Sequence, residues 1–247
     1  NPALRFGLGA NSTLNLDFEY LTSAHNADSG LPIVGGILPN VPRTRSYQSP
    51  YDLSEQTIFR FRADYEVQIS DNFTMRDKIY YTHLDWPSQG TIFNGAFPNA
   101  QGSLDLARTL LDLKDEQAIV GHQFEGLLRL NTSRLDHQLL FGLEVAQHTD
   151  DFTLDVALLS SQNLFTLSTS VPSNLAALFP PEAGTDSLRV SLPDQTSAGR
   201  TAATTIAPYF IDRISLNPQL DLFLGGRYDN VDYEDVISAT ARKYSQL

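Results

Sequence analysis

The chain contains no cysteine, one methionine and one tryptophan among its 247 residues. The absence of cysteine excludes disulfide bonds, thiolate metal sites and cysteine nucleophiles. Basic residues are also scarce, because 17 Lys and Arg stand against 29 Asp and Glu, which gives a formal charge of −12. A balance of that sign argues against a general nucleic-acid binder, which needs clustered positive charge.

Long apolar runs are missing too. No stretch of about 20 apolar residues occurs, so the sequence contains no transmembrane helix. No signal peptide is visible, the chain opens at Asn1, and its one methionine is the internal Met75. We therefore expect either a processed chain or a piece of a longer one.

Several catalytic signatures are also absent. Gly7 and Gly9 lack the third glycine of a dinucleotide loop, no G-x-S-x-G elbow is present, and the histidines show no H-E-x-x-H spacing. Glu125 and Glu144 could pair on neighbouring strands for acid–base work, but charged residues are common inside barrels. We predict no catalytic residue, no metal site, no cofactor and no enzymatic activity.

The sequence does contain a two-residue alternation of apolar and polar side chains over long stretches. It is clearest in residues 55–70, where Phe59, Phe61 and Tyr65 share one face and Arg60 and Arg62 share the other. The same alternation, with some interruptions, marks further segments as strands: 12–24, 72–86, 115–132, 136–148, 204–216 and 220–231. With the strand end at 4–9, the sequence predicts about eight antiparallel strands.

The predicted strands are joined by connections of two alternating lengths. Tight joints carrying turn residues lie at 9–13, 70–73, 132–137 and 216–220. Long loops are expected near 25–54, 87–113 and 149–203, and from about 236 onward. Short turns at one end and long loops at the other are typical of an up-and-down outer-membrane barrel, with periplasmic turns and extracellular loops.

A soluble β-sandwich is the alternative, since its strands also alternate. The strands here are more than twice the usual length of about 5–6 residues. Phe73 and Tyr81 lie about 26 Å apart along one strand at ~3.3 Å per residue, or roughly 20 Å after a ~40° tilt, close to the ~25 Å apolar band of a barrel. A basic side chain at the lipid mid-plane costs ~2–4 kcal/mol, so we predict a set of lumen-facing residues: Arg60, Arg62, Glu66, Glu125, Arg129, Glu144 and Arg227.

Sequence motifs add a family resemblance to this pattern. Residues 12–20, followed by Asp28-Ser29-Gly30-Leu31-Pro32, resemble the "TxLxLxYxY…DxGxP" stretch of TonB-dependent siderophore receptors. "FGLG" at 6–9, the strand pair 58–86, "HQLLFGLE" at 137–144 and "APYFIDRISLNPQLDLFLGGRYD" at 207–229 follow in the family's order. Within that family, the motifs resemble most closely those of receptors for ferric catecholate siderophores.

The resemblance implies a bacterial outer-membrane barrel of about 22 strands closed around an N-terminal plug. This chain shows no plug, TonB-binding segment or aromatic-ended final strand, so it resembles an internal barrel segment; a complete eight-stranded barrel is the alternative. The family binds a ferric siderophore outside and imports it when TonB pulls the plug, with iron carried only as cargo. The implied partners are the siderophore, the TonB complex, the lipid bilayer and lipopolysaccharide.

Candidate ligand contacts lie in the predicted long loops. Arginine offers a planar cationic fork that stacks on rings, and aromatic residues give amphipathic contact area, which suits a rigid, anionic ferric chelate. The candidates are Arg43, Arg45, Tyr47, Tyr51, Trp86, Phe93, Phe97 and Arg108, with Phe165, Phe179 and Arg189 in the third loop. The alternative is that these residues pack the loops together or meet lipopolysaccharide.

Two other functions remain open at this stage. A passive porin or a small barrel adhesin would share the strand pattern but would not need TonB. A secreted glycan-binding β-sandwich would have mostly polar outward faces, whereas this sequence places Phe59, Phe61, Phe141 and Leu143 in apolar stripes.

Overall fold

The computed structural model describes residues 1–26, 28–132, 135–170, 189–191, 196–237 and 240–246. Within these ranges the regular structure is all β. None of the described residues belongs to a helix long and apolar enough to cross a membrane. The strands are β1 (Ala3–Gly7), β2 (Ser12–His25), β3 (Leu53–Ser70), β4 (Phe73–Pro98), β5 (Leu104–Asn131), β6 (Asp136–Asn163), β7 (Thr169–Ser170), β8 (Arg189–Ser191), β9 (Ser197–Asn217), β10 (Leu220–Arg227), β11 (Asn230–Ile237) and β12 (Thr240–Gln246).

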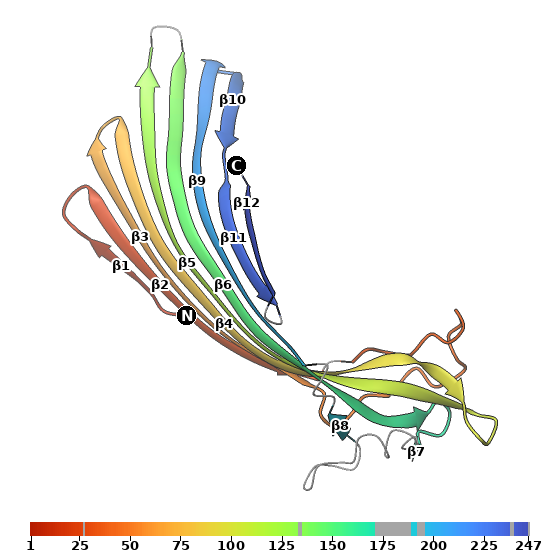
Figure 1. Ribbon diagram of the computed structural model, residues 1–247. Helices are drawn as coiled ribbons and strands as arrows, with labels where there is room; N and C mark the ends of the chain where they lie inside the picture. The colour runs from red at the N-terminus through yellow and green to blue at the C-terminus, as the bar shows by residue number, and fades with distance from the viewer. Residues whose placement is uncertain (27, 133–134, 171–188, 192–195, 238–239, 247) are drawn as a thin grey trace.

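These strands form one antiparallel sheet in the order β1-β2-β3-β4-β5-β6-β9-β11-β12. β10 pairs with β9, and the short β7 and β8 pair with β6. Figure 1 shows a tall, strongly curved sheet whose described strands do not close on themselves. The predicted all-β, antiparallel up-and-down architecture is confirmed.

The tight joints lie at one end of the sheet, as predicted. Asp71 and Asn72 alone separate β3 from β4, and residues 218–219 separate β9 from β10. The joint at 132–137 includes residues outside the described part of the chain. At the opposite end only the first predicted long loop has the expected character, because its described residues, 26 and 28–52, form one short bridge, between Val34 and Ile37, and are otherwise irregular.

The predicted extents of the other two long loops are wrong. β4 continues to Pro98 and β5 begins at Leu104, so most of 87–113 is a strand hairpin. Likewise β6 continues to Asn163 and β9 begins at Ser197, which removes both ends of the predicted 149–203 loop. The segment predicted as loop from about 236 contains β12.

Pro87 is the main reason why the hairpin looks like a loop in the sequence. The β3–β4 pairs run from Thr57–Asp85 to Ser54–Ser88 without pairs between, so the ladder is interrupted where the proline lacks its N–H. Pro87 still pairs with Lys114 on β5. A proline at a break in one ladder is compatible with a strand.

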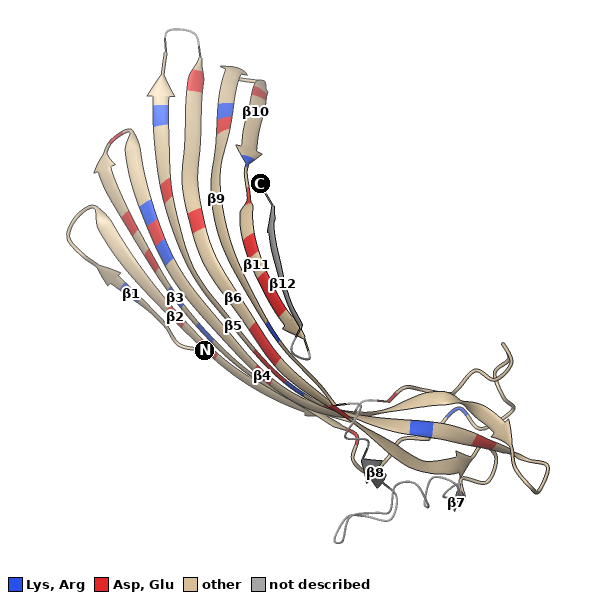
Figure 2. Cartoon of the chain, in the orientation of Figure 1, with Lys and Arg blue, Asp and Glu red and all other residues tan. Residues whose placement is uncertain are grey.

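The register places all seven predicted lumen residues on one face of the sheet. Directly paired residues lie on the same side of a ladder, and the row Asp64–Lys78–Gln123–Glu144 crosses β3 to β6. Alternation along each strand then adds the remaining residues of this polar face: Arg60, Arg62, Glu66, Glu125, Arg129 and Arg227. Figure 2 shows charged positions recurring along the strands of the curved sheet.

The opposite face is mainly apolar, although it also carries the His122–Asp77 and His137–Asp212 pairs, and no described segment covers its apolar stretch. Phe141 is 38% exposed, and Leu143 and Phe210 on the same face are also exposed. An exposed apolar surface of this length marks an interaction or membrane-facing surface. The apolar stripe ends at the in-register row Asp85–Glu116–Asp151–Arg200, where this face becomes charged.

The packed core lies beyond that row. Buried residues form two clusters, Tyr47 with Leu106 and Leu164, and Leu110 with Ala157 and Leu159. We name residues 28–52, 87–113 and 152–168 the distal layer, because they lie at the end of the sheet away from the tight turns (Figure 1).

Candidate lumen wall and distal binding layer

The polar face carries in-register ion pairs between neighbouring strands. Arg60 contacts Glu19 at 2.5 Å, Arg62 contacts Asp17 at 3.0 Å, and Arg76 contacts Glu66 at 2.7 Å. Opposite charges directly across a ladder stabilise strand pairing. The pairs also leave this part of the wall close to neutral, despite its density of charged groups.

A hydrogen-bonded network continues the wall across β4 to β10. Glu144 accepts hydrogen bonds from the Tyr80 hydroxyl at 2.7 Å and from Arg227 Nη1 at 2.8 Å. Tyr209 donates to Glu125 at 2.6 Å and accepts from Gln123 Nε2 at 2.6 Å. Two of the predicted lumen acids are therefore held by tyrosines as well as by the sheet.

The sequence analysis identified neither tyrosine as part of such a network. Each lies across a glycine on the next strand: an added Cβ at Gly121 would fall 2.1 Å from the Tyr80 ring, and one at Gly142 would fall 2.4 Å from the Tyr209 ring. Glycine inside a strand often marks a close approach of this kind. The isolated glycines in these two strands were the available signal.

Two predicted ligand contacts lie inside the distal layer. Tyr47 is fully buried, and its hydroxyl donates to the Leu164 carbonyl at 2.7 Å. Arg45 Nη1 donates to the carbonyls of Leu164 at 3.0 Å and Phe165 at 2.7 Å. These two side chains join the first loop to the end of β6.

Arg108 also makes its contacts within the distal layer and is more deeply buried than Arg45. Its side chain, 5% exposed, donates from Nη1 to the carbonyls of Tyr47 at 2.9 Å and Gln48 at 3.3 Å, and to Gln162 Oε1 at 3.0 Å. Nε and Nη2 both donate to the Ser160 carbonyl, at 3.2 and 2.9 Å. Burial lowers the pKa of the Arg108 guanidinium, and the charge of Asp52 opposes that shift.

A second buried contact fixes the same loop to β4. Asp52 accepts from the Thr91 amide at 3.1 Å, the Thr91 hydroxyl at 2.6 Å and the Ser49 hydroxyl at 2.5 Å. All three residues are at least nine-tenths buried. The sequence analysis did not identify this group, because short polar residues in a loop carry no signal of burial.

The remaining candidates divide into inward and outward groups. Trp86 Nε1 donates to Ser54 Oγ at 2.8 Å, Phe93 packs edge-on against Tyr47, and Tyr51 packs on the Leu110 cluster. Arg43 and Phe97 are exposed, Phe97 by 40%. In the third loop Phe165 is exposed, whereas Phe179 and the side chain of Arg189 lie outside what the structure describes.

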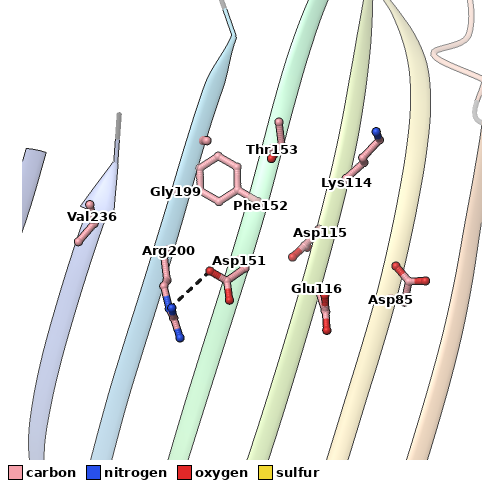
Figure 3. Close-up of a pocket in the computed structure, with 11 residues that line it drawn as sticks. Asp85, Lys114, Asp115, Glu116, Asp151, Phe152, Thr153, Gly199, Arg200 and Val236 are labelled. Carbon is pink, nitrogen blue, oxygen red and sulfur yellow. Dashed lines mark ion pairs between the residues drawn. The ribbon is translucent and has the colours of Figure 1, made fainter. Parts of the chain in front are cut away.

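A hollow of about 530 Å³ lies where the apolar stripe ends. Figure 3 shows its lining from β4, β5, β6 and β9, including Asp85, Lys114, Glu116 and the Asp151–Arg200 ion pair at 3.5 Å. Within the described residues, no group of three or more His, Asp or Glu side chains is arranged to hold a metal ion. The hollow is therefore a surface of mixed charge.

Comparison with known proteins places this sheet in a family. The family model described as "TonB dependent receptor-like, beta-barrel" matches residues 3–246. No curated protein matches the sequence. Among solved structures, the ferric-catecholate import receptor Fiu of E. coli K12 superposes with a TM-score of 0.71 at 18% identity, covering 95% of this chain and 36% of that one.

Other solved receptors give the same result. The siderophore receptor PiuA of Acinetobacter baumannii has a TM-score of 0.74 at 16% identity, over 99% of this chain and 36% of that one. FpvA of P. aeruginosa, solved with an iron-bound pyoverdine, has a TM-score of 0.71 at 16% identity, over 98% and 31%. The chain thus spans about a third of the receptors that it matches, and at these identities the likeness shows the fold.

Proposed function

This chain belongs to the TonB-dependent receptor β-barrel family, and from that premise we propose that it forms part of an outer-membrane receptor that binds a ferric siderophore and imports it with energy supplied through TonB. The family match over residues 3–246 is the observation that carries the proposal. Members of this family are outer-membrane barrels. The apolar face then meets lipid, and the polar face with Arg60, Arg62 and Glu144 lines the lumen.

The distal layer would form the extracellular rim. The tight turns lie at the opposite end of the sheet, which is the periplasmic end of an outer-membrane barrel. The charged row from Asp85 to Arg200 would lie at the level of the lipopolysaccharide headgroups. β4, β5 and β6 therefore each pass from a periplasmic turn, through the apolar band, to the rim.

The proposed ligand is a ferric siderophore, the class of ligand that the names of the similar receptors give for those proteins. Arg43 and Phe97 are the exposed candidates on the rim, where an arginine fork and an aromatic ring would suit an anionic chelate. Tyr47 and Arg108 instead donate hydrogen bonds to backbone carbonyls within the distal layer. Iron enters as cargo, and TonB would act through a plug in the remainder of the receptor.

The proposal is tested by titrating the purified full-length receptor with a panel of ferric siderophores, catecholates first, and following intrinsic fluorescence. Saturable quenching by a ferric chelate, lost with its iron-free form and weakened in Arg43→Ala and Phe97→Ala, is expected. The passive-porin alternative predicts no saturable binding together with open conductance in planar bilayers. That pair of results would replace the receptor proposal.

A further inference from the structure

Residues 45–52 form a strap that lies on the strand extensions of the distal layer (Figure 1). Tyr47 packs against Leu106 and Leu164, and Tyr51 packs on the cluster around Leu110. The strap therefore covers β5 and β6 with apolar side chains on both sides of Arg108. A segment of irregular backbone can be buried this way only if its polar groups find partners.

Arg108 supplies those partners from the centre of the covered surface. Its Nη1 binds the carbonyls of Tyr47 and Gln48 in the strap, while Nε and Nη2 bind the Ser160 carbonyl on β6. Within the described part of the chain, Arg108 donates to carbonyl and amide oxygens, all of them uncharged, so the planar fork joins backbone segments. A flexible single-point cation could not make both sets of bonds.

The strap is fixed at both its ends as well as at its centre. Arg45 binds the carbonyls of Leu164 and Phe165 at the beginning. Asp52 binds Thr91 on β4 at the end. A strap that closed over a ligand would have to break these buried bonds, whereas a fixed strap holds its neighbours in place before the ligand arrives.

We propose that Arg108 is a positioning residue for ligand binding: it clamps residues 45–52 onto β5 and β6 as a fixed shelf, which holds Arg43 in one preformed position at the rim. Arg43 lies two residues before the strap. The proposal rests on the proposed function, because it assigns the shelf to siderophore binding.

The test uses the full-length receptor with Arg108→Met, which removes the donors and keeps much of the side chain's length. Arg5→Met, an exposed arginine on β1, is the matched control. Amide exchange in residues 45–52 should rise in Arg108→Met alone. The association rate of the ferric siderophore should fall about tenfold with little change in dissociation, because the binding-competent fraction falls. Arg108→Lys should restore little of either property.

Several results would overturn the proposal. Unchanged exchange at 45–52 in Arg108→Met, or full rescue by Arg108→Lys, would show that the fork does not clamp the strap. Faster exchange with unchanged or faster association would show that the strap does not position the rim. If Arg108→Met does not assemble, Arg45→Met should give the same two changes, and its failure to do so counts equally against the shelf. Absence of ferric siderophore binding by the wild-type receptor would instead refute the proposed function.

Discussion

Gly121 and Tyr80 meet on the polar face so closely that a methyl group cannot fit between them. A Cβ at Gly121 would lie 2.1 Å from the ring, so Gly121→Ala must move Tyr80 and weaken its bond to Glu144. We expect the free energy of unfolding of the full-length receptor to fall by about 1–3 kcal/mol, the usual cost of overpacking. Chemical denaturation in detergent measures it.

Gly90→Ala is the control for that substitution, because a Cβ there meets nothing within 4 Å. Equal stability losses in the two variants would contradict the steric account and would indicate a general requirement for glycine in these strands.

Asp150, beside the charged row in the middle of β6, gives this level of the sheet a predicted pH dependence. Burial first, and then the nearby Asp115 carboxylate, raise the pKa of Asp150. The folded protein therefore keeps a proton that the unfolded chain releases, so stability contributed by this group falls as pH rises from about 4, the ordinary aspartate pKa, through the raised pKa. Asp150→Asn should remove that decline.

The comparison is made by thermal unfolding of both proteins across pH 3–8. Wild type and Asp150→Asn should differ progressively above about pH 4, with the variant more stable. The exposed Asp85→Asn serves as the control. Parallel curves for wild type and Asp150→Asn would contradict the assignment.

The sequence could predict the position of a side chain only where that position depends on residues nearby in the chain. Strand alternation was sufficient to put Arg60, Glu66 and Glu144 on one face, since the period of two is set by the backbone. It could not show that Tyr47 and Arg108 are buried, because their cover comes from segments 50 to 120 residues away. Composition alone made them resemble ligand contacts.

The β4–β5 hairpin extends well beyond the charged row that ends the apolar stripe. Because residues 104–113 on β5 are paired with β4 on one side and for most of their length with β6 on the other, their amides should exchange slowly. Residues 99–103 at the tip, whose amides are held by local hydrogen bonds of the turn, should exchange faster than 104–113. Mass-resolved hydrogen exchange of the full-length receptor measures both segments.

Fast amide exchange throughout 87–113 would instead support the prediction from the sequence that this segment is a loop. The sequence favoured a loop because Pro87, Gly90, Gly95 and Pro98 are turn residues. The interruption of the β3–β4 ladder at Pro87 shows how β4 accommodates this proline without ending.

Phe141 tests which face of the strands meets lipid. It lies on the apolar face of β6, 38% exposed, with its ring stacked 6.4 Å from Phe73. Phe141→Arg should impair membrane assembly, because a basic side chain in the apolar band costs ~2–4 kcal/mol at mid-depth. The yield of heat-resistant folded receptor in outer membranes is the measurement.

Ala146→Arg on the same strand is the control, because Ala146 lies on the polar face with Glu144. It should assemble normally. Normal yield of Phe141→Arg, or a loss confined to Ala146→Arg, would reverse the assignment of the two faces.

The molecule as a whole combines a self-paired polar wall, an apolar outer face and a packed rim. Its formal charge of −12 is spread over the wall and the rim, where arginines such as Arg60, Arg62 and Arg227 are already paired with acids. Charge selection of a ligand would therefore depend on exposed groups of the rim, among them Arg43, more than on the total charge.

The most direct measurement of the central proposal is uptake of radiolabelled iron by cells in which the full-length receptor is the only siderophore route. The account predicts saturable uptake of at least one ferric siderophore that disappears when either the receptor or TonB is removed. Absence of uptake for every ferric siderophore supplied, or uptake that persists without TonB, would contradict it.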